Sequence, residues 1–453
     1  MNKLLLKGVA AAFCMATMFG TTACGDDDDL VNVEPPVEET QDVILEGEIT
    51  SDMTLKAADN NLLRGFVYVT DGVTLTIEPG TVIKGEKSSK GSLIVERGGK
   101  LIAEGTAEKP IVFTSDQPKA SRTYGDWGGL ILCGKSIVNN TAGEAQIEGG
   151  PRSYYGGKDP EDNSGIVKYV RIEFAGYPLE PNKEINGLTC GGVGRGTTIE
   201  YVQVSFCGDD SFEWFGGTVN AKHLIAYKGW DDEFDTDYGF QGKLQFLLGV
   251  RDPKHADTSK SNGFESDNDA DGSNNTPLTT PVFSNVTLIG PFYGESAGKT
   301  ENDIFYVTED AANGAKGGSF QAAMHIRRNS SLNVYNSIFV GWPYGLYLQN
   351  ANVGAVVKNV IFAGMWENFK DKTSQNYFQT ADLSNLTYAS SNDIIAKDGD
   401  YTSIVADKID VADFSDTALN DAFFEKVSYK GAFDGKNDWA ANWTNFDPNN
   451  TEY

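Results

Sequence analysis

The sequence is poor in histidine, in cysteine and in positive charge. Its 453 residues include three histidines and five cysteines, and 37 basic against 64 acidic side chains leave a formal net charge of −27. Because nucleic acids and anionic membrane surfaces repel such a chain, we exclude both as charge-driven partners. No Cys-x-x-Cys pair or cysteine–histidine cluster occurs, so a zinc site is not expected either.

Catalytic signals are equally scarce. None of the three histidines stands in a recognisable triad with a serine or a cysteine, and we predict no catalytic residue. The odd number of cysteines inside the fold leaves at least one without an internal partner, and we expect all three to be small buried residues. The histidines are His223, His255 and His325, and the cysteines inside the fold are Cys133, Cys190 and Cys207.

The N-terminus has the order of a bacterial lipoprotein leader. Two lysines precede an apolar run over residues 8–20 that is too short to cross a bilayer as a helix. The sequence "TTAC" that ends at Cys24 resembles a lipobox, although Thr21 stands where that motif usually has leucine. We predict a signal peptide over residues 1–23 and a lipid, such as palmitate, on Cys24. The alternative is a cleaved leader on a free secreted protein.

An acidic segment follows the predicted lipid. Residues 25–29, "GDDDD", resemble the export signal that sends Bacteroidetes-type lipoproteins to the cell surface. The rest of residues 24–41 is rich in Glu, Val and Pro, which is typical of a flexible tether. We therefore predict a lipid-anchored protein of the outer membrane that faces outward.

From residue 42 the sequence changes to short apolar runs separated by glycine, without helical spacing. "TIEYVQVSFCGDDSFEWFGG" and "AKHLIAYKGWDDEFDTDYG" align at an offset of 22 residues, and Asn336 and Asn359 mark a later repeat of 23. This period fits one coil of a parallel β-helix. We predict an all-β fold with the β-helix over residues 42–366 and a C-terminal cap over 367–453. The residues expected to stack inside it are Phe212, Phe234, Phe264 and Leu346.

Several stretches resemble one family of surface proteins. "LTIEPGTVIKG", "GDWGGLILCGK", "GDDSFEWFGGTVN" and the terminal "YKGAFDGKNDWAANWTNFDPNNTEY" are similar to Bacteroidetes-type surface lipoproteins with a right-handed, pectate-lyase-like β-helix. The similarity spans most of residues 60–453. It implies the fold and the cell-surface location, but the family has no assigned reaction.

Paired acids recur one coil apart and predict columns of carboxylates. Residues one coil apart lie about 4.8 Å from each other, and like charges on neighbouring strands repel. The groups must splay into water, take up protons or bind a cation, and oxygen-only ligands favour Ca²⁺. Ca²⁺ is the candidate cofactor, but a chain with 64 acids forms acidic clusters by chance, so a merely solvated acidic face is the alternative. The candidate ligands are Asp209, Asp210, Glu213, Asp231, Asp232, Asp235, Asp237 and Glu265.

Aromatic residues flank these acids, and aromatic rings beside carboxylates are typical of sugar-binding surfaces. We predict ligand contacts from Trp230, Tyr238, Phe240 and Arg251, whereas Trp214 is expected to point inward. The predicted function is binding of an extracellular polysaccharide, or an accessory role in a TonB-dependent outer-membrane nutrient-import complex.

The alternative function is a Ca²⁺-dependent polysaccharide lyase or glycosidase. "GDDS" at residues 208–211 resembles the Asp-Asp motif of polygalacturonase-type glycosidases. The Gly-His-Gly that this motif requires one coil later is replaced here by "WDDEF", and the Arg-Ile-Lys is missing. Arg251 and Lys243 are lyase-base candidates by proximity in sequence only.

Overall fold

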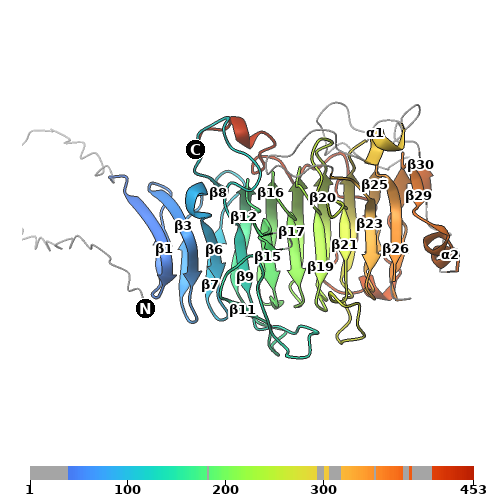
Figure 1. Ribbon diagram of the computed structural model, residues 1–453, viewed down its shortest axis with the longest axis horizontal. Coiled ribbons are helices and arrows are strands. Elements are labelled where there is room, and N and C mark those ends of the chain that lie inside the picture. The colour runs from blue at the N-terminus through green and yellow to red at the C-terminus, as the bar shows by residue number, and fades with distance from the viewer. Residues whose placement is uncertain are drawn as a thin grey trace, which may run out of the picture.

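The chain folds as a right-handed parallel β-helix. The computed structural model describes residues 39–180, 183–292, 300–305, 318–350, 354–380, 387–389 and 411–453. The predicted leader, Cys24 and nearly all of the tether lie outside these residues. Figure 1 shows the strands side by side along one axis, from β1 at one end to β29 and β30 at the other. None of the described helices is long and apolar enough to cross a membrane.

Each coil contributes strands to three parallel sheets. Long strands span two of them, namely β1 (Asp42–Ile49), β3 (Asn60–Val69), β12 (Gly165–Glu173), β16 (Thr198–Ser205), β18 (Ala221–Tyr227), β20 (Lys243–Val250) and β22 (Val282–Ile289). Shorter strands complete these sheets, namely β2 (Met53–Leu55), β4 (Thr74–Ile77), β5 (Val82–Gly85), β7 (Lys100–Glu104), β8 (Ile111–Ser115), β24 (Asn333–Tyr335), β25 (Ile338–Val340), β27 (Val356–Lys358), β28 (Ile361–Ala363) and β30 (Thr387–Ala389).

The remaining sheet carries the predicted acids. This sheet begins with parts of β1 and β3. Its other strands are β6 (Ser92–Val95), β9 (Leu130–Cys133), β15 (Leu188–Gly191), β17 (Phe212–Phe215), β19 (Phe234–Asp237), β21 (Phe264–Ser266), β23 (Ala322–Arg327), β26 (Tyr344–Gln349) and β29 (Glu367–Phe369). We call the outward side of β15 to β29 the site face. Two small hairpins, β10–β11 (Ala145–Gln146, Tyr154–Tyr155) and β13–β14 (Pro178–Glu180, Lys183–Glu184), lie in insertions between coils.

The interior is a ladder of apolar side chains in register. Phe212 pairs with Phe234 and Phe234 with Phe264, and the ladder continues through Met324 to Leu346. All five side chains are buried, as is Trp214. The predicted stacking is therefore confirmed, with Met324 as a rung that the sequence repeat did not identify. Cys133, Cys190 and Cys207 are free and buried, as expected.

The long strands bend at a residue in the left-handed region. Tyr169, Tyr201, His223, Phe246 and Asn285 occupy the bend in successive coils with φ values of 50, 55, 57, 62 and 58°. Side chains other than glycine and asparagine rarely adopt this conformation. Here the side chains stack on one another, with ring centroids 4.4 Å apart for Tyr169–Tyr201 and 4.2 Å for Tyr201–His223.

The C-terminal segment differs from the predicted cap. Strands β29 and β30 pair with β26 and β28, so the β-helix continues beyond residue 366, with α2 (Lys372–Thr380) between these two strands. Residues 411–453, which we call the strap, do not cover only the last coils. Asn359 donates to the Val411 carbonyl near the last coils, while Lys84 donates to the Tyr453 carbonyl near the first. Figure 1 places the C-terminus beside the early strands β8 and β12.

Apolar side chains explain why a strap is needed. The outward side of the long strands carries Ile225, Leu248 and Ile289, which are buried with Phe433 and Trp443 of the strap. Without this cover a row of aliphatic groups would face water. The remaining helices among the described residues are short, namely α1 (Glu301–Phe305) and 3₁₀ turns at Lys87–Ser89, Thr417–Leu419 and Pro448–Asn450.

Buried amides fasten the strap, and this generates a first prediction. Gln245 is fully buried, donates to the Glu425 carbonyl at 2.8 Å and accepts from the Glu425 amide at 2.8 Å. Replacing Gln245 with alanine leaves both backbone groups unpaired, so we expect a loss of about 1–3 kcal/mol in the free energy of unfolding by urea. The exposed Gln241→Ala variant is the matched control and should change stability little. Equal effects of both substitutions would contradict the fastening role.

Candidate metal and ligand site

In one outward column of the site face, the type of side chain changes from coil to coil. Register places Glu213 over Thr189, Asp235 over Glu213 and Glu265 over Asp235. His325 and Tyr347 follow in the next two coils. The predicted alignment of Glu213, Asp235 and Glu265 is therefore confirmed.

A second set of acids lies in the turns that lead into these strands. Asp210 accepts a hydrogen bond from the Asp232 backbone N–H at 2.8 Å, and Asp232 accepts one from the Asn262 backbone N–H. Each of these carboxylates thus ties its own coil to the next one. The second acid of each pair has a structural role that the sequence repeat alone did not show. Asp231 instead accepts from the hydroxyl of Ser259 at 2.6 Å, and its other oxygen has no partner.

Carboxylate oxygens from adjacent coils converge in three overlapping groups. Within each group, one ligand oxygen from every residue lies within 4.8 Å of the others. Asp235 has one buried oxygen without a hydrogen-bond partner, as Asp231 does. Oxygen donors at this spacing suit a hard divalent cation. The groups are Asp209–Asp210–Asp231, Asp210–Glu213–Asp235 and Asp232–Asp235–Glu265.

Asp237 is a predicted ligand that belongs to none of these groups. It follows Phe215 in the neighbouring column, and one of its oxygens accepts from the Tyr238 backbone N–H at 2.6 Å. The other seven predicted ligands all take part in at least one group.

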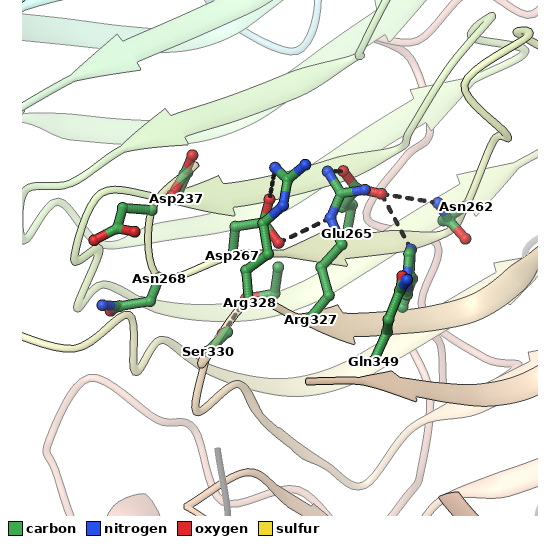
Figure 2. A network of polar contacts seen from close by, with 12 residues as sticks. Asp237, Asn262, Glu265, Asp267, Asn268, Arg327, Arg328, Ser330 and Gln349 are labelled. Atoms are coloured by element: carbon green, nitrogen blue, oxygen red, sulfur yellow. Dashed lines mark hydrogen bonds and ion pairs between the residues drawn. The ribbon is translucent and has the colours of Figure 1, made fainter. Parts of the chain in front are cut away.

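The acidic part of the site face ends at β23, where arginine side chains form ion pairs with the last carboxylates (Figure 2). Arg327 pairs with Glu265 and with Asp267, the latter at 2.8 Å, and Arg328 contacts the other oxygen of Asp267 at 2.8 Å. The ring of His325 lies 3.2 Å from a Glu265 oxygen through Nδ1 and 3.0 Å from Gln349 through Nε2. The carboxylates nearest β23 are thus neutralised by the protein, whereas those nearer β17 are not.

Burial and mutual repulsion favour protonation of the unneutralised acids. Burial, followed by the charge of Asp257, raises the pKa of Asp231 to about 7. Burial, followed by the neighbouring carboxylates, raises the pKa of Asp210, Asp232 and Asp235 well above the usual range. These groups either hold protons near neutral pH or require a cation.

Three of the predicted ligand-contacting residues are in the interior. Trp230 and Arg251 are each 1% exposed and Phe240 is 0% exposed. Phe240 stacks on Trp214, and Arg251 donates to the carbonyls of Gly229 and Asp231. The expectation that these three contact a ligand is wrong, because Phe240 belongs to the core of the β-helix and Trp230 packs against Tyr124 and His255.

Tyr238 is half-buried and stays a candidate for ligand contact. The proposed base Lys243 pairs with Asp421 of the strap at 2.6 Å, away from the site face.

Insertions supply site residues that the sequence did not identify. Asn186 donates to Glu213, and its own carbonyl oxygen is buried without a partner. Burial raises the pKa of Glu148 to about 7 in the same neighbourhood. Both residues precede Glu213 outside the aligned repeat, so no periodic signal pointed to them.

The pH dependence of stability gives a second prediction. A carboxyl whose pKa is higher in the folded than in the unfolded protein stabilises the fold at low pH, and this contribution is lost as pH rises through the folded pKa. In EDTA the melting temperature should therefore fall between about pH 4 and about pH 7, a window bounded by the ordinary carboxyl pKa and the raised pKa of Asp231. In the Asp210→Asn/Asp232→Asn variant each amide keeps one oxygen that can accept the backbone hydrogen bond, but neither side chain carries a charge. This variant should be more stable than the wild type near pH 8. A flat wild-type profile would show that these carboxylates are merely solvated.

One family model matches most of the chain, including all residues of the site. The family model described as a pectate-lyase-like β-helix domain matches residues 47–444. No curated protein and no solved structure matches the chain. The matched range includes the site face and most of the strap.

Proposed function

Since the chain belongs to the pectate-lyase-like β-helix domain family, we propose that it binds an extracellular glycan with the help of Ca²⁺ held by its carboxylate columns. Family membership fits a carbohydrate-related role. The observation that carries the proposal is the convergence of carboxylate oxygens from adjacent coils, with unpartnered oxygens on Asp231 and Asp235. A cation bound there keeps coordination positions for sugar hydroxyl or carboxylate oxygens.

The arginines beside the acids support binding more than cleavage. A lyase requires a base that removes a proton from the sugar. Burial lowers the pKa of Arg327, but the charges of Glu265 and Asp267 outweigh it and leave the pKa above its ordinary value. A guanidinium in this state fits the orientation of carboxylates rather than proton abstraction. Ca²⁺-dependent cleavage of a polysaccharide is the second candidate, favoured by the family alone.

The cellular setting is part of the proposal and depends on the sequence. Cys24 follows a lipobox-like sequence, and residues 25–29 are acidic. We place the protein on the outer membrane, lipid-anchored and facing outward, where a glycan-binding β-helix serves a nutrient importer of the TonB-dependent type.

Calcium should stabilise the fold and control glycan binding. At ten times its Kd, Ca²⁺ adds about 1.4 kcal/mol to the free energy of unfolding, seen as a rise in melting temperature at fixed ionic strength. Mg²⁺ should do less, because it resists dehydration and irregular geometry. Calorimetric titration with polygalacturonate should give binding with Ca²⁺ and none with EDTA.

Matched variants separate the site from general charge effects. Asp235→Asn should lose the calcium shift and the calcium-dependent binding, while the exposed Asp52→Asn should keep both. Release of unsaturated or reducing sugars by the wild type but not by Asp235→Asn would replace binding with catalysis. Equal calcium responses of the two variants would remove the metal from the proposed site.

The lipid anchor is tested in cells. Cys24→Ala should leave the protein without lipid and absent from the outer-membrane fraction. Replacing Asp26 to Asp29 with alanine should keep the lipid but remove accessibility to protease added to intact cells. An unchanged distribution of the Cys24 variant would contradict the anchor.

A further inference from the structure

The turn that leads into β19 has three consecutive backbone carbonyls fixed by side chains from the insertion between β20 and β21. Arg251 donates to the Gly229 carbonyl at 3.1 Å and also to the Asp231 carbonyl. The hydroxyl of Ser261 donates to the Trp230 carbonyl at 2.8 Å, and both donor residues are buried. Rotation of any of these three peptide groups would break a buried hydrogen bond, so the backbone of the turn is held in one orientation.

A buried glutamate holds the guanidinium in this position. The Nε of Arg251 lies 3.4 Å from an oxygen of Glu233, and both side chains are fully buried. The backbone N–H of Arg251 donates to the Ile289 carbonyl at 2.9 Å, so the residue is also fixed in its coil. Removing two charges from water is unfavourable, and a well-packed apolar pair of similar volume is often as stable. Stability alone therefore does not account for this ion pair.

The ion pair belongs to one coil and is absent from the coils on either side. The corresponding residues are Ser211 and Lys228 in the preceding coil and Gly263 and Gly290 in the following one. The chain also makes room for the glutamate, because a Cβ on Gly249 would lie 3.1 Å from the Cγ of Glu233. A feature that does not recur with the repeat serves something local to its coil. The local feature here is the turn with Asp231 and Asp232.

We propose that Arg251 and Ser261 are positioning residues for cation binding, with Glu233 orienting Arg251. They hold the turn so that Asp231 and Asp232 present their carboxylates to the cation. These two acids belong to different carboxylate groups, so one turn serves both groups. The inference rests on the proposed calcium-dependent function and adds residues that control affinity without touching the ion. Groups that orient the ligands of a metal commonly affect its affinity in this way.

The need for such a hold follows from the repulsion between the columns. Without fixed carbonyls, the turn could move so that the carboxylate of Asp231 turns away from its acidic neighbours and into water. Ca²⁺ would then have to order the backbone of the turn as well as the side chains, and its affinity would fall by the cost of that ordering. With the turn already held, the cation has only the side chains to order.

Calcium titration of Arg251→Lys tests this role. Lysine keeps a positive charge beside Glu233, but its single ammonium group replaces a planar fork that reaches two carbonyls. In calorimetric titration of protein freed of metal, we expect Ca²⁺ to bind this variant about tenfold to a hundredfold more weakly than the wild type. Gln245→Ala, which loosens the strap, is the matched control for lost stability and should keep the wild-type Kd. Equal Kd values for the wild type and Arg251→Lys, or equal weakening by both variants, would overturn the proposal.

Ser261→Ala tests the remaining hydrogen bond without disturbing the buried ion pair. Because one hydrogen bond to the turn is lost, we expect about fivefold weaker Ca²⁺ binding than in the wild type. Should Arg251→Lys fail to fold, this variant decides the question. An unchanged Kd in Ser261→Ala would then overturn the positioning role.

Hydrogen exchange without Ca²⁺ separates this inference from the proposed function. The Trp230 N–H donates to the Cys207 carbonyl at 2.9 Å, so its protection reports on the turn. A peptide covering the turn should exchange faster in Arg251→Lys than in the wild type or in Gln245→Ala. If the wild type binds no Ca²⁺ but this difference in exchange is found, the proposed function fails and the hold on the turn stands. If the wild type binds Ca²⁺ and Arg251→Lys changes neither the exchange nor the Kd, the proposed function stands and the positioning role fails.

Discussion

Everything in this structure depends on the repeat of the same position at every coil. In a parallel β-helix a side chain lies directly over its counterpart, about 4.8 Å away, so each column interacts with itself. Inside the helix this favours the ladder from Phe212 through Phe234 and Phe264, whose rings are 5.6 Å apart at each step. Outside the helix the same geometry brings like charges together, as in Glu213 and Asp235. The fold therefore creates an electrostatic cost that other groups must offset.

Three different solutions to this cost are visible on the site face. In the turns, the carboxylates of Asp210 and Asp232 accept backbone hydrogen bonds from the next coil, so they are held in place. Near β23, guanidinium groups neutralise Glu265 and Asp267 (Figure 2). Between these regions Glu213 accepts from Asn186 and Asp235 has an oxygen without a partner, but among the described residues no cationic side chain is paired with either, which is the condition that favours a bound cation or bound protons. A site emerges where the protein supplies no counter-charge of its own.

The sequence predicts the positions of residues that recur with the repeat, but it does not predict how the insertions and the strap fold. The 22-residue offset was enough to align Glu213 with Asp235 and to place Trp214 inside, because a repeat fixes the register directly. The offset gave no information on how residues 251–261 fold over the turn, so Trp230 and Arg251 were expected outside and lie inside. The strap was expected at the last coils, but its hydrogen bonds extend from Asn359 to Lys84. Such contacts join residues far apart in the chain and leave no periodic signal.

The position of the strap is related to the position of the site face, because they occupy different outward sides of the β-helix. A solenoid exposes three sides, and on two of them part of the outward surface is apolar and must be covered. The strap covers the aliphatic side with Phe433 and Trp443, and an insertion covers the early coils of the site face with Tyr155. The later coils of that face carry acids, then arginines and finally Lys370. The order of charges therefore follows the helix axis: Glu213, Asp235 and Glu265 make three successive coils acidic, and the arginines follow in the next one.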